Sequence, residues 1–179
     1  MASRTENCIL VGMMGSGKTT LGRRLAKECN REFVDLDREI ERRNGVSVAT
    51  IFEIEGEGGF RQRESQLLAE IAQSEGLIVA TGGGIVLSPL NRARLLTSPG
   101  VVYLHATASL LYARTRNDRS RPLLQVANPL ARIRQLVEQR DPLYREVADV
   151  VIEAGREPGA VVEEIKAWMP TLVPTLCKH

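Results

Sequence analysis

The chain has few cysteines, no long hydrophobic run and almost no net charge, and each of these shortages excludes a class of protein. Its three cysteines, Cys8, Cys29 and Cys177, lack metal-ligand spacing and cannot all pair with one another, which fits a reducing compartment. No apolar run is long enough to span a bilayer, and no apolar targeting segment follows residues 1–7. A net charge of +2 is too small to indicate a nucleic acid or an anionic membrane as the main partner. We therefore expect a cytoplasmic protein that binds neither nucleic acid nor membrane.

The length and composition predict a single globular domain. The 179 residues are 43% hydrophobic and 26% charged, which is ordinary for a globular protein large enough to bury a core. We expect this domain to span residues 1–170. Residues 171–179 follow Pro170 and contain Pro174, and we expect them to form a loosely ordered tail. No additional interaction segment stands out, so we expect a monomer.

Apolar runs alternate with longer amphipathic stretches along the chain. The expected strands are Cys8–Val11, Phe33–Leu36, Leu77–Ala80, Val101–Leu104 and Val150–Ile152. The expected helices are Lys18–Cys29, Arg38–Arg43, Val48–Ile54, Phe60–Gln73, Pro89–Leu96, Ser109–Arg116, Pro129–Arg140 and Gly159–Trp168. This alternation predicts an α/β fold in which helices cover both faces of a parallel sheet. Ligands of such sheets bind at the carboxyl ends of the strands, so side chains there are candidates for function.

The first expected strand is followed by a glycine-rich loop and then by a helix. Residues 12–19 read Gly-Met-Met-Gly-Ser-Gly-Lys-Thr, which is the P-loop pattern. The glycines allow backbone N–H groups to curve around a phosphate, and the helix N-terminus adds positive potential. We expect Lys18 to reach the β- and γ-phosphates and Thr19 to offer its hydroxyl to Mg²⁺. The predicted ATP-binding residues of this loop are Gly12, Gly15, Ser16, Gly17, Lys18, Thr19 and Thr20. The alternative is a glycine-rich turn that merely joins two elements.

Two acids, Asp35 and Asp37, stand at the end of the second expected strand. Residues two apart on a strand point to the same side, so both carboxylates are expected to project together while Leu36 enters the core. Two adjacent like charges need a cation or a donor between them. We expect Asp35 to bind Mg²⁺ through water, and Asp37 to accept a proton or a hydrogen bond from a substrate hydroxyl. The alternative is a structural role, in which Asp37 caps the helix Arg38–Arg43.

One arginine is expected on the apolar face of a helix. Arg140 falls in the same helical stripe as Leu136 and Val137, and Asp141-Pro142 is expected to end the helix directly after it. An inward guanidinium needs an anionic partner. That partner is either the carboxylate of a ligand, held by two parallel hydrogen bonds, or an internal acid.

A second arginine is expected beside a buried acid. Glu64 lies on the apolar face of the helix Phe60–Gln73 and Arg61 lies at its edge, so the two can pair across three residues. An arginine held in this way can orient toward a bound carboxylate. Arg63 is expected to point away into solvent, as part of an ordinary surface ion pair.

A triple glycine follows the third expected strand. Gly82, Gly83 and Gly84 permit the close approach of a ligand to the backbone, although a flexible connector would have the same composition. If the fold brings this turn beside the P-loop, it becomes a wall for the acceptor of a phosphate.

The interval Asn117–Asn128 is polar and fits neither a helix nor a strand. A loop of this length in a compact domain is commonly a functional cover or a disordered insert. The surrounding basic cluster consists of Arg114, Arg116, Arg119 and Arg121. No aromatic side chains are interleaved with these arginines for stacking on RNA bases. We therefore expect a lid that brings arginine charge over the phosphates of a nucleotide.

Together these segments resemble one known family, the shikimate kinases, over nearly the whole chain. The motifs that carry the resemblance are Gly12–Thr20, Asp35-Leu36-Asp37, Gly56-Glu57 with Phe60-Arg61, Gly82-Gly83-Gly84, Arg121-Pro122-Leu123-Leu124 and Arg140-Asp141-Pro142-Leu143-Tyr144. The resemblance implies Mg²⁺-dependent transfer of the ATP γ-phosphate to the 3-hydroxyl of shikimate, a step of aromatic amino-acid biosynthesis. It also implies a P-loop kinase fold, with five parallel strands in the order 2-3-1-4-5 and a mobile lid.

The resemblance also implies roles for individual residues. The catalytic residues it implies are Asp37, Lys18 and Arg121. Arg61 and Arg140 would grip the shikimate carboxylate in an acceptor site made of Asp37, Phe52, Phe60, Arg61, Glu64, Gly82, Gly83, Gly84 and Arg140. Arg121 would reach the phosphates from the lid, and Arg114 and Arg156 would lie near the adenine.

Other functions of P-loop proteins remain as alternatives. A kinase for another small anionic hydroxy metabolite, such as gluconate, would use the same fold and the same inward arginines. A nucleotide-dependent switch is disfavoured, because guanine recognition commonly uses Asn-Lys-x-Asp and no asparagine here precedes a lysine. A motor ATPase is also disfavoured, because the strand Leu77–Ala80 ends in Thr81 and glycine rather than in an acidic pair.

Overall fold

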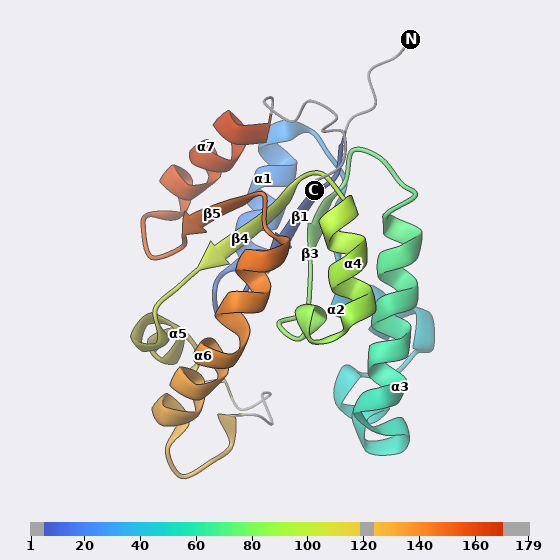
Figure 1. Ribbon diagram of the computed structural model, residues 1–179, viewed down its shortest axis with the longest axis vertical. Helices are drawn as coiled ribbons and strands as arrows, with labels where there is room; N and C mark the ends of the chain where they lie inside the picture. The colour runs from blue at the N-terminus through green and yellow to red at the C-terminus, as the bar shows by residue number, and fades with distance from the viewer. Residues whose placement is uncertain (1–5, 119–123, 170–179) are drawn as a thin grey trace.

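A five-stranded sheet forms the centre of the computed structural model, which describes residues 6–118 and 124–169 (Figure 1). The strands are β1 Cys8–Val11, β2 Phe33–Asp35, β3 Ile78–Ala80, β4 Val101–His105 and β5 Val150–Glu153. Their order is β2-β3-β1-β4-β5, which confirms the predicted order. All four neighbouring pairs are parallel, so the carboxyl ends of the strands lie at one edge of the sheet.

The central strand shows why the apolar runs become strands. All four residues of β1 are buried, and the strand pairs with β3 on one side and β4 on the other. A parallel strand covered on both faces needs continuous rather than alternating hydrophobicity, which is the pattern of its sequence. The edge strand β5 is less buried, and Val151 on it is 38% exposed.

Helices cover both faces of the sheet. They are α1 Lys18–Cys29, α2 Leu36–Asn44, α3 Val48–Ile71, α4 Pro89–Thr97, α5 Ala108–Thr115, α6 Pro129–Val147 and α7 Pro158–Trp168, with a short 3₁₀ helix at Ile85–Leu87. With right-handed crossovers, the strand order puts α1 on one face and α3, α4 and α6 on the other, and α7 packs beside α1 (Figure 1). Within the described residues, no helix combines the length and the hydropathy that crossing a membrane requires.

The helix α3 joins two segments that the sequence predicts as separate helices. The expected helices Val48–Ile54 and Phe60–Gln73 are the two arms of α3, which is kinked at Gly56. Gly56 has φ 71° and ψ −177°, a conformation open essentially only to glycine.

The predicted end of α6 at Arg140 is wrong. The helix continues through Pro142 to Val147, although proline removes one backbone donor and crowds the preceding turn. Tyr144 and Val147 are fully buried beyond the proline. Their packing against the core outweighs the local preference to stop, so Arg140 lies inside the helix.

Candidate functional site

The loop between β1 and α1 has the geometry of a phosphate cradle. Gly12, Gly15 and Gly17 have φ values of 146°, 79° and 99°, which side chains rarely permit. A Cβ at Gly12 would lie 2.7 Å from the carbonyl oxygen of Leu104 on the neighbouring strand. The strand, the loop and the helix that begins at Lys18 are therefore arranged as the sequence predicts. The loop is a shaped turn that requires its glycines, not a generic connector.

Lys18 extends along this loop. Its Nζ donates to the carbonyl oxygens of Gly12, at 2.7 Å, and Met13, at 2.8 Å. The residue is only 8% exposed. A charged amine buried against carbonyl dipoles gives the loop a fixed positive charge near the edge where the strands end.

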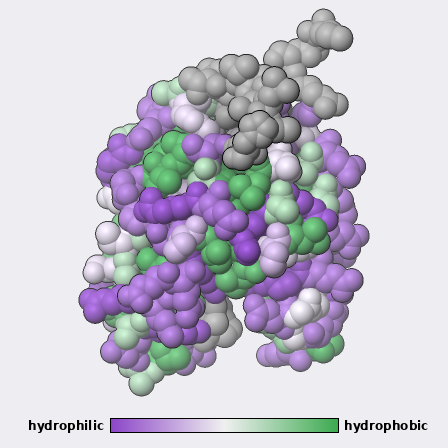
Figure 2. All heavy atoms as spheres, in the orientation of Figure 1, coloured by the Kyte–Doolittle hydropathy of each residue, from purple (hydrophilic) through white to green (hydrophobic). Residues whose placement is uncertain are grey.

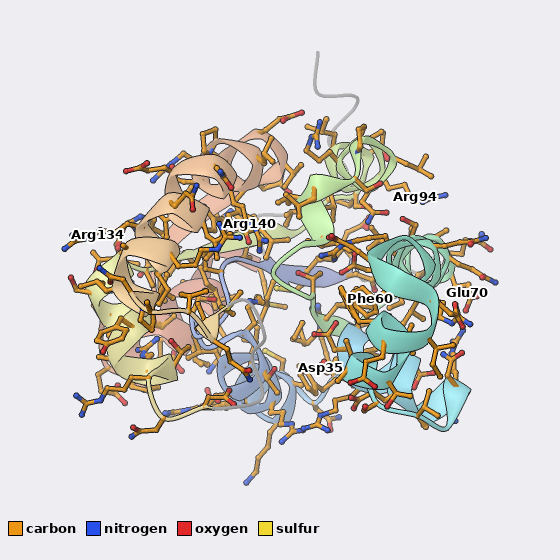
Figure 3. All side chains as sticks on the ribbon, turned by 90° about the horizontal axis from the view of Figure 1, so that it is seen from below. Asp35, Phe60, Glu70, Arg94, Arg134 and Arg140 are labelled. Atoms are coloured by element: carbon orange, nitrogen blue, oxygen red, sulfur yellow. The ribbon has the colours of Figure 1, made fainter. Side chains whose placement is uncertain are left out.

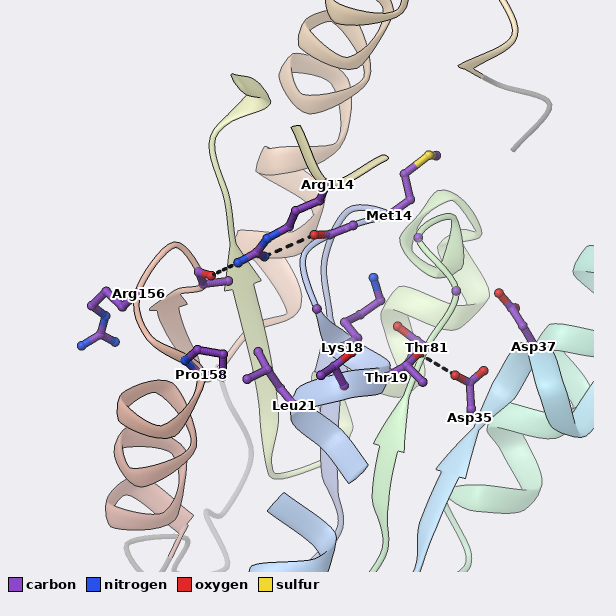
Figure 4. Close-up of a pocket in the computed structure, with 16 residues that line it drawn as sticks. Met14, Lys18, Thr19, Leu21, Asp35, Asp37, Thr81, Arg114, Arg156 and Pro158 are labelled. Atoms are coloured by element: carbon purple, nitrogen blue, oxygen red, sulfur yellow. Dashed lines mark hydrogen bonds between the residues drawn. The ribbon is translucent and has the colours of Figure 1, made fainter. Parts of the chain in front are cut away.

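A cavity of about 490 Å³ opens in front of the loop and runs along the carboxyl ends of the strands (Figure 4). Its lining residues are Met14, Gly15, Gly17, Lys18, Thr19, Thr20, Leu21, Asp35, Asp37, Thr81, Gly82, Gly83, Arg114, Ala154, Arg156 and Pro158. Arg156 lies at one end of the labelled group and Asp37 at the other, with Lys18 between them (Figure 4). The cavity therefore joins the P-loop to the first two glycines of the triple-glycine turn.

Two predicted nucleotide-site arginines lie at the far end of this cavity from Asp37. Arg114 donates to the carbonyl oxygens of Gly15 and Ser16, both at 3.3 Å, and of Ala154 at 3.0 Å. It thereby ties α5 to the P-loop and to the end of β5. Arg156 is more exposed and its guanidinium pairs with Glu164.

Asp35 is a capping residue as well as a partner of the P-loop helix. The strand ends at Asp35, whose carboxylate accepts from the backbone N–H of Arg38 and caps α2. Its other oxygen accepts from the Thr19 hydroxyl at 2.7 Å (Figure 4). The prediction that Asp35 and Asp37 share one side of a strand is wrong, and so is the alternative that Asp37 is the cap. Leu36 is fully buried, as predicted, but as the first residue of a helix.

Asp37 lies in the first turn of α2 and faces the cavity. Burial and the neighbouring charge of Asp35 raise the pKa of its carboxyl, while Lys18 and Arg61 act in the opposite direction. Its Oδ1 is buried and has no hydrogen-bond partner in the described part of the chain. A buried carboxylate oxygen without a donor is unfavourable, so this atom is suited to accept from a ligand.

Glu64 is fully buried on α3 and pairs with Arg61, as the sequence predicts. Arg61 Nη1 donates to Glu64 Oε2 at 2.8 Å, and the same guanidinium contacts Glu57 at 3.3 Å. Burial raises the pKa of the Glu64 carboxyl to about 7, against the stabilising charge of Arg61. Arg63 pairs with Glu55, which is the ordinary surface ion pair expected from the sequence.

The triple-glycine turn lies against these side chains. A Cβ at Gly82 would lie 2.9 Å from Asp37 Oδ1 and 3.0 Å from Glu64 Oε1, and Glu64 Oε1 also lacks a partner within residues 6–118 and 124–169. A Cβ at Gly84 would collide with the Arg61 guanidinium. A side chain at either position would displace these groups, so the turn is a close wall of the site and not a flexible connector.

Arg140 approaches the same turn from α6. It is 5% exposed, and its Nη1 donates to the carbonyl oxygen of Gly83 at 3.2 Å. No acid among the described residues pairs with it. Arg61 is thus held by protein acids, whereas Arg140 keeps hydrogen-bonding capacity for an anion.

Two phenylalanines lie on α3, the helix that also carries Arg61 and Glu64. The rings of Phe52 and Phe60 lie 4.9 Å apart, with Phe60 buried and Phe52 partly exposed. Seen from below, the labelled Arg140, Phe60 and Asp35 come from three elements around a central opening, while Arg134 lies on the outside (Figure 3). The same opening is a hollow between the lower ends of α3 and α6 on the space-filling surface (Figure 2).

The predicted acceptor residues are only partly in the cavity lining. Asp37, Gly82 and Gly83 line it, whereas the remaining members lie behind or beside them: Phe52, Phe60, Arg61, Glu64, Gly84 and Arg140. Arg121, predicted to act from the lid, lies outside the described residues.

Several lining residues were not predicted from the sequence. Met14, Thr81, Ala154 and Pro158 belong to the cavity because the loops after β1, β3 and β5 meet at one edge of the sheet. Their position after apolar runs was the available signal, but these uncharged side chains carry no chemical signature of a binding site.

Comparisons with known proteins agree with this geometry. The family model described as shikimate kinase matches residues 14–170. A shikimate kinase from Aromatoleum aromaticum is 56% identical over 172 residues, which cover 96% of this chain and 98% of that protein. The structure of shikimate kinase from Acinetobacter baumannii in complex with shikimate aligns with a TM-score of 0.89 and 45% identity, covering 93% of this chain and 94% of that one. A gluconokinase from Sinorhizobium meliloti aligns over 95% of both chains with a TM-score of 0.57 and 19% identity, a likeness of fold alone.

Proposed function

The chain belongs to the shikimate kinase family, and on that premise we propose that it transfers the γ-phosphate of ATP to the 3-hydroxyl of shikimate. The products would be shikimate 3-phosphate and ADP. The observation that carries the proposal concerns Asp37, which lines the cavity that begins at the P-loop and whose buried Oδ1 has no hydrogen-bond partner among the described residues. A proton acceptor across the cavity from a phosphate cradle supports transfer to an alcohol.

The nucleotide would lie along the P-loop side of the cavity. Its phosphates would take the backbone N–H groups of Gly15, Ser16, Gly17 and Lys18 together with the N-terminus of α1. The Lys18 ammonium would then exchange loop carbonyls for phosphate oxygens. Arg114 and Arg156 support an adenine position at the far end, where both line the cavity. Arg121 would add charge from the proposed lid, residues 117–128.

The residues beside the P-loop fit a magnesium ion. Thr19 and Asp35 supply a hydroxyl and a carboxylate oxygen already 2.7 Å apart, and Mg²⁺ prefers few protein oxygens together with phosphates and waters. Thr19 would hold the ion directly and Asp35 through water. When bound, the ion neutralises charge on the β- and γ-phosphates.

The acceptor would occupy the hollow between α3 and α6. Arg140 and Arg61 would bind its carboxylate, with Glu64 keeping Arg61 in place, while Phe52 and Phe60 would contact the ring. Asp37 would take the proton of the attacking hydroxyl as the new O–P bond forms and the bond from the γ-phosphorus to the bridging oxygen breaks. The raised pKa of Asp37 favours that proton transfer.

A coupled ADP-release assay across small hydroxy acids tests the proposal. We expect ADP release with ATP and shikimate, far less with GTP, and background release with gluconate or quinate. Product mass spectrometry identifies a shikimate monophosphate. Turnover of gluconate without turnover of shikimate would contradict the proposal and favour the alternative metabolite kinase.

We also propose a monomer whose single domain spans residues 1–170, working in the cytoplasm on these two substrates without nucleic acid or membrane. The thiol pattern supports the cytoplasm, and the small net charge supports the absence of nucleic-acid and membrane partners. Sedimentation at assay concentration tests the oligomeric state, and a dimer would contradict it.

A further inference from the structure

Tyr144 is a fully buried residue of α6 to which the proposed reaction assigns no role. Its hydroxyl donates to the carbonyl oxygen of Gly83 in the triple-glycine turn. The same hydroxyl lies 3.7 Å from the sulfur of Met13 in the P-loop. One side chain thus contacts both walls of the cavity, the one that cradles phosphate and the one that faces the acceptor.

Gly83 is the point where these two walls meet. A Cβ at Gly83 would lie 3.3 Å from the backbone nitrogen of Met14 and 3.7 Å from the carbonyl oxygen of Gly12, so the turn packs directly on the P-loop. The Gly83 carbonyl also accepts from Arg140 Nη1 at 3.2 Å. Its orientation therefore affects the turn and the guanidinium together.

The surroundings of Tyr144 hold its ring firmly and keep its hydroxyl a donor. The ring stacks on that of Tyr103, with centroids 4.9 Å apart and planes 28° apart. Burial raises the pKa of the Tyr144 hydroxyl to about 12, so it stays protonated at neutral pH. The hydroxyl of Tyr103 points elsewhere and donates to Asp141 Oδ1 at 2.8 Å.

We propose that Tyr144 is a positioning residue for phosphoryl transfer: its hydroxyl holds the Gly83 carbonyl and so fixes the acceptor wall against the P-loop. The inference rests on the proposed transfer to shikimate. Without the hydroxyl, the Arg140 guanidinium is the remaining donor to the Gly83 carbonyl among the described residues, and the turn is held less firmly. The acceptor hydroxyl then loses its alignment with the γ-phosphate, whereas the nucleotide cradle keeps its own hydrogen bonds.

The test compares Tyr144→Phe with Tyr103→Phe, each of which removes one hydroxyl from the same stacked pair. We expect Tyr144→Phe to lower kcat by about 10-fold to 100-fold, the range associated with a misplacement of about 1 Å, and to raise the KM for shikimate by about threefold or more. The Kd for ATP, measured by calorimetry without acceptor, should change by less than about twofold. Tyr103→Phe should leave all three values within about twofold of the wild type.

Three results with these variants would overturn the proposed role of Tyr144. Equal kinetics for Tyr144→Phe and the wild type would overturn the inference, as would equal losses for the two variants, because the stack would then be purely structural. Failure of Tyr144→Phe to unfold cooperatively in a thermal melt would also overturn it, by making the hydroxyl a requirement of the fold. A wild-type chain inactive on shikimate would instead contradict the proposed function.

Discussion

The two walls of the cavity are built in different ways. The phosphate-binding part of the nucleotide wall comes from one continuous segment, residues 12–19, in which Lys18 donates to two loop carbonyls. The acceptor wall draws on α2, α3, the triple-glycine turn and α6, and it contains two buried carboxylate oxygens without donors in the described residues, on Asp37 and Glu64. The first wall is therefore shaped within one segment, whereas the second is assembled from distant segments and leaves these two oxygens without a donor in the described residues.

This difference indicates where specificity and chemistry reside. A loop of backbone N–H groups beside a buried lysine suits phosphate, a group common to many substrates. Buried acceptors that lack donors favour a ligand with hydroxyl groups in matching positions, because leaving them unpaired is costly. Changes in the acceptor wall should therefore separate transfer and acceptor affinity from nucleotide binding.

The largest expected effect is that of Asp37→Asn. An amide cannot take the hydroxyl proton, so turnover should fall by about 10²-fold to 10⁴-fold, the range of general base catalysis. ATP affinity should be preserved, because the P-loop, Thr19 and Asp35 are unchanged. Turnover by the ADP-release assay and ATP binding by calorimetry check this. Turnover near the wild-type value would remove Asp37 from the mechanism.

Arg140→Lys should be next in size. Lysine keeps the charge but loses the planar fork that binds a carboxylate with two hydrogen bonds, so shikimate affinity should fall by about 10-fold to 100-fold. ATP affinity should change far less. Arg134→Lys, at an exposed position of the same helix, is the matched control. Equal losses of both ligands in Arg140→Lys would indicate a folding defect and contradict the assignment.

Glu64→Gln tests the acceptor wall through stability rather than turnover. The pKa of Glu64 is raised by burial from 4.5 to about 7 in the folded chain, so the folded state holds this proton more tightly than the unfolded state. Its contribution to stability is full below pH 4.5 and is lost as the pH rises toward about 7. The slope this produces is at most about 1.4 kcal/mol per pH unit.

In Glu64→Gln the decrease in unfolding free energy with rising pH should disappear, apart from a smaller contribution of the same sign from Asp37. Urea unfolding between pH 4.5 and 7 measures it, with Glu70→Gln on the exposed side of the same helix as the control. Groups with lowered pKa values, such as Glu39 at about 2, act in the opposite direction and mainly below this window. An unchanged slope would show that Glu64 is ionised in the folded state throughout the range.

The smallest expected effect lies on the nucleotide wall. Arg156 is half-exposed and paired with Glu164, so Arg156→Ala should weaken ATP binding by about fivefold or less, as for an exposed charge. Shikimate affinity should not change. Calorimetry with ATP measures the loss, which should shrink in higher salt. A loss greater than about tenfold would mean that Arg156 leaves Glu164 to bind the nucleotide directly.

Local pattern predicts the elements whose limits are set locally. The helix α1 has its predicted bounds because the P-loop must end where the helix begins and Asn30, in a left-handed conformation, ends it. The burial of Glu64 and Arg140 also follows from helical spacing alone. The prediction that Asp37 follows the alternation of a strand failed because β2 ends at Asp35. Asp35 caps α2, so Asp37 already belongs to the first turn of that helix.

The sequence by itself determined the phosphate loop, the strand order expected from the family resemblance and the identity of the inward charges. The phosphate loop and the inward charges depend on contiguous residues and on helical periodicity, whereas the strand order was implied by the resemblance. Only the tertiary structure decided that Pro142 stays inside α6, that Gly82 meets Asp37 and Glu64, and that Tyr144 joins the two walls. Those contacts connect segments up to 131 residues apart, where packing against distant neighbours outweighs the preference of any local stretch.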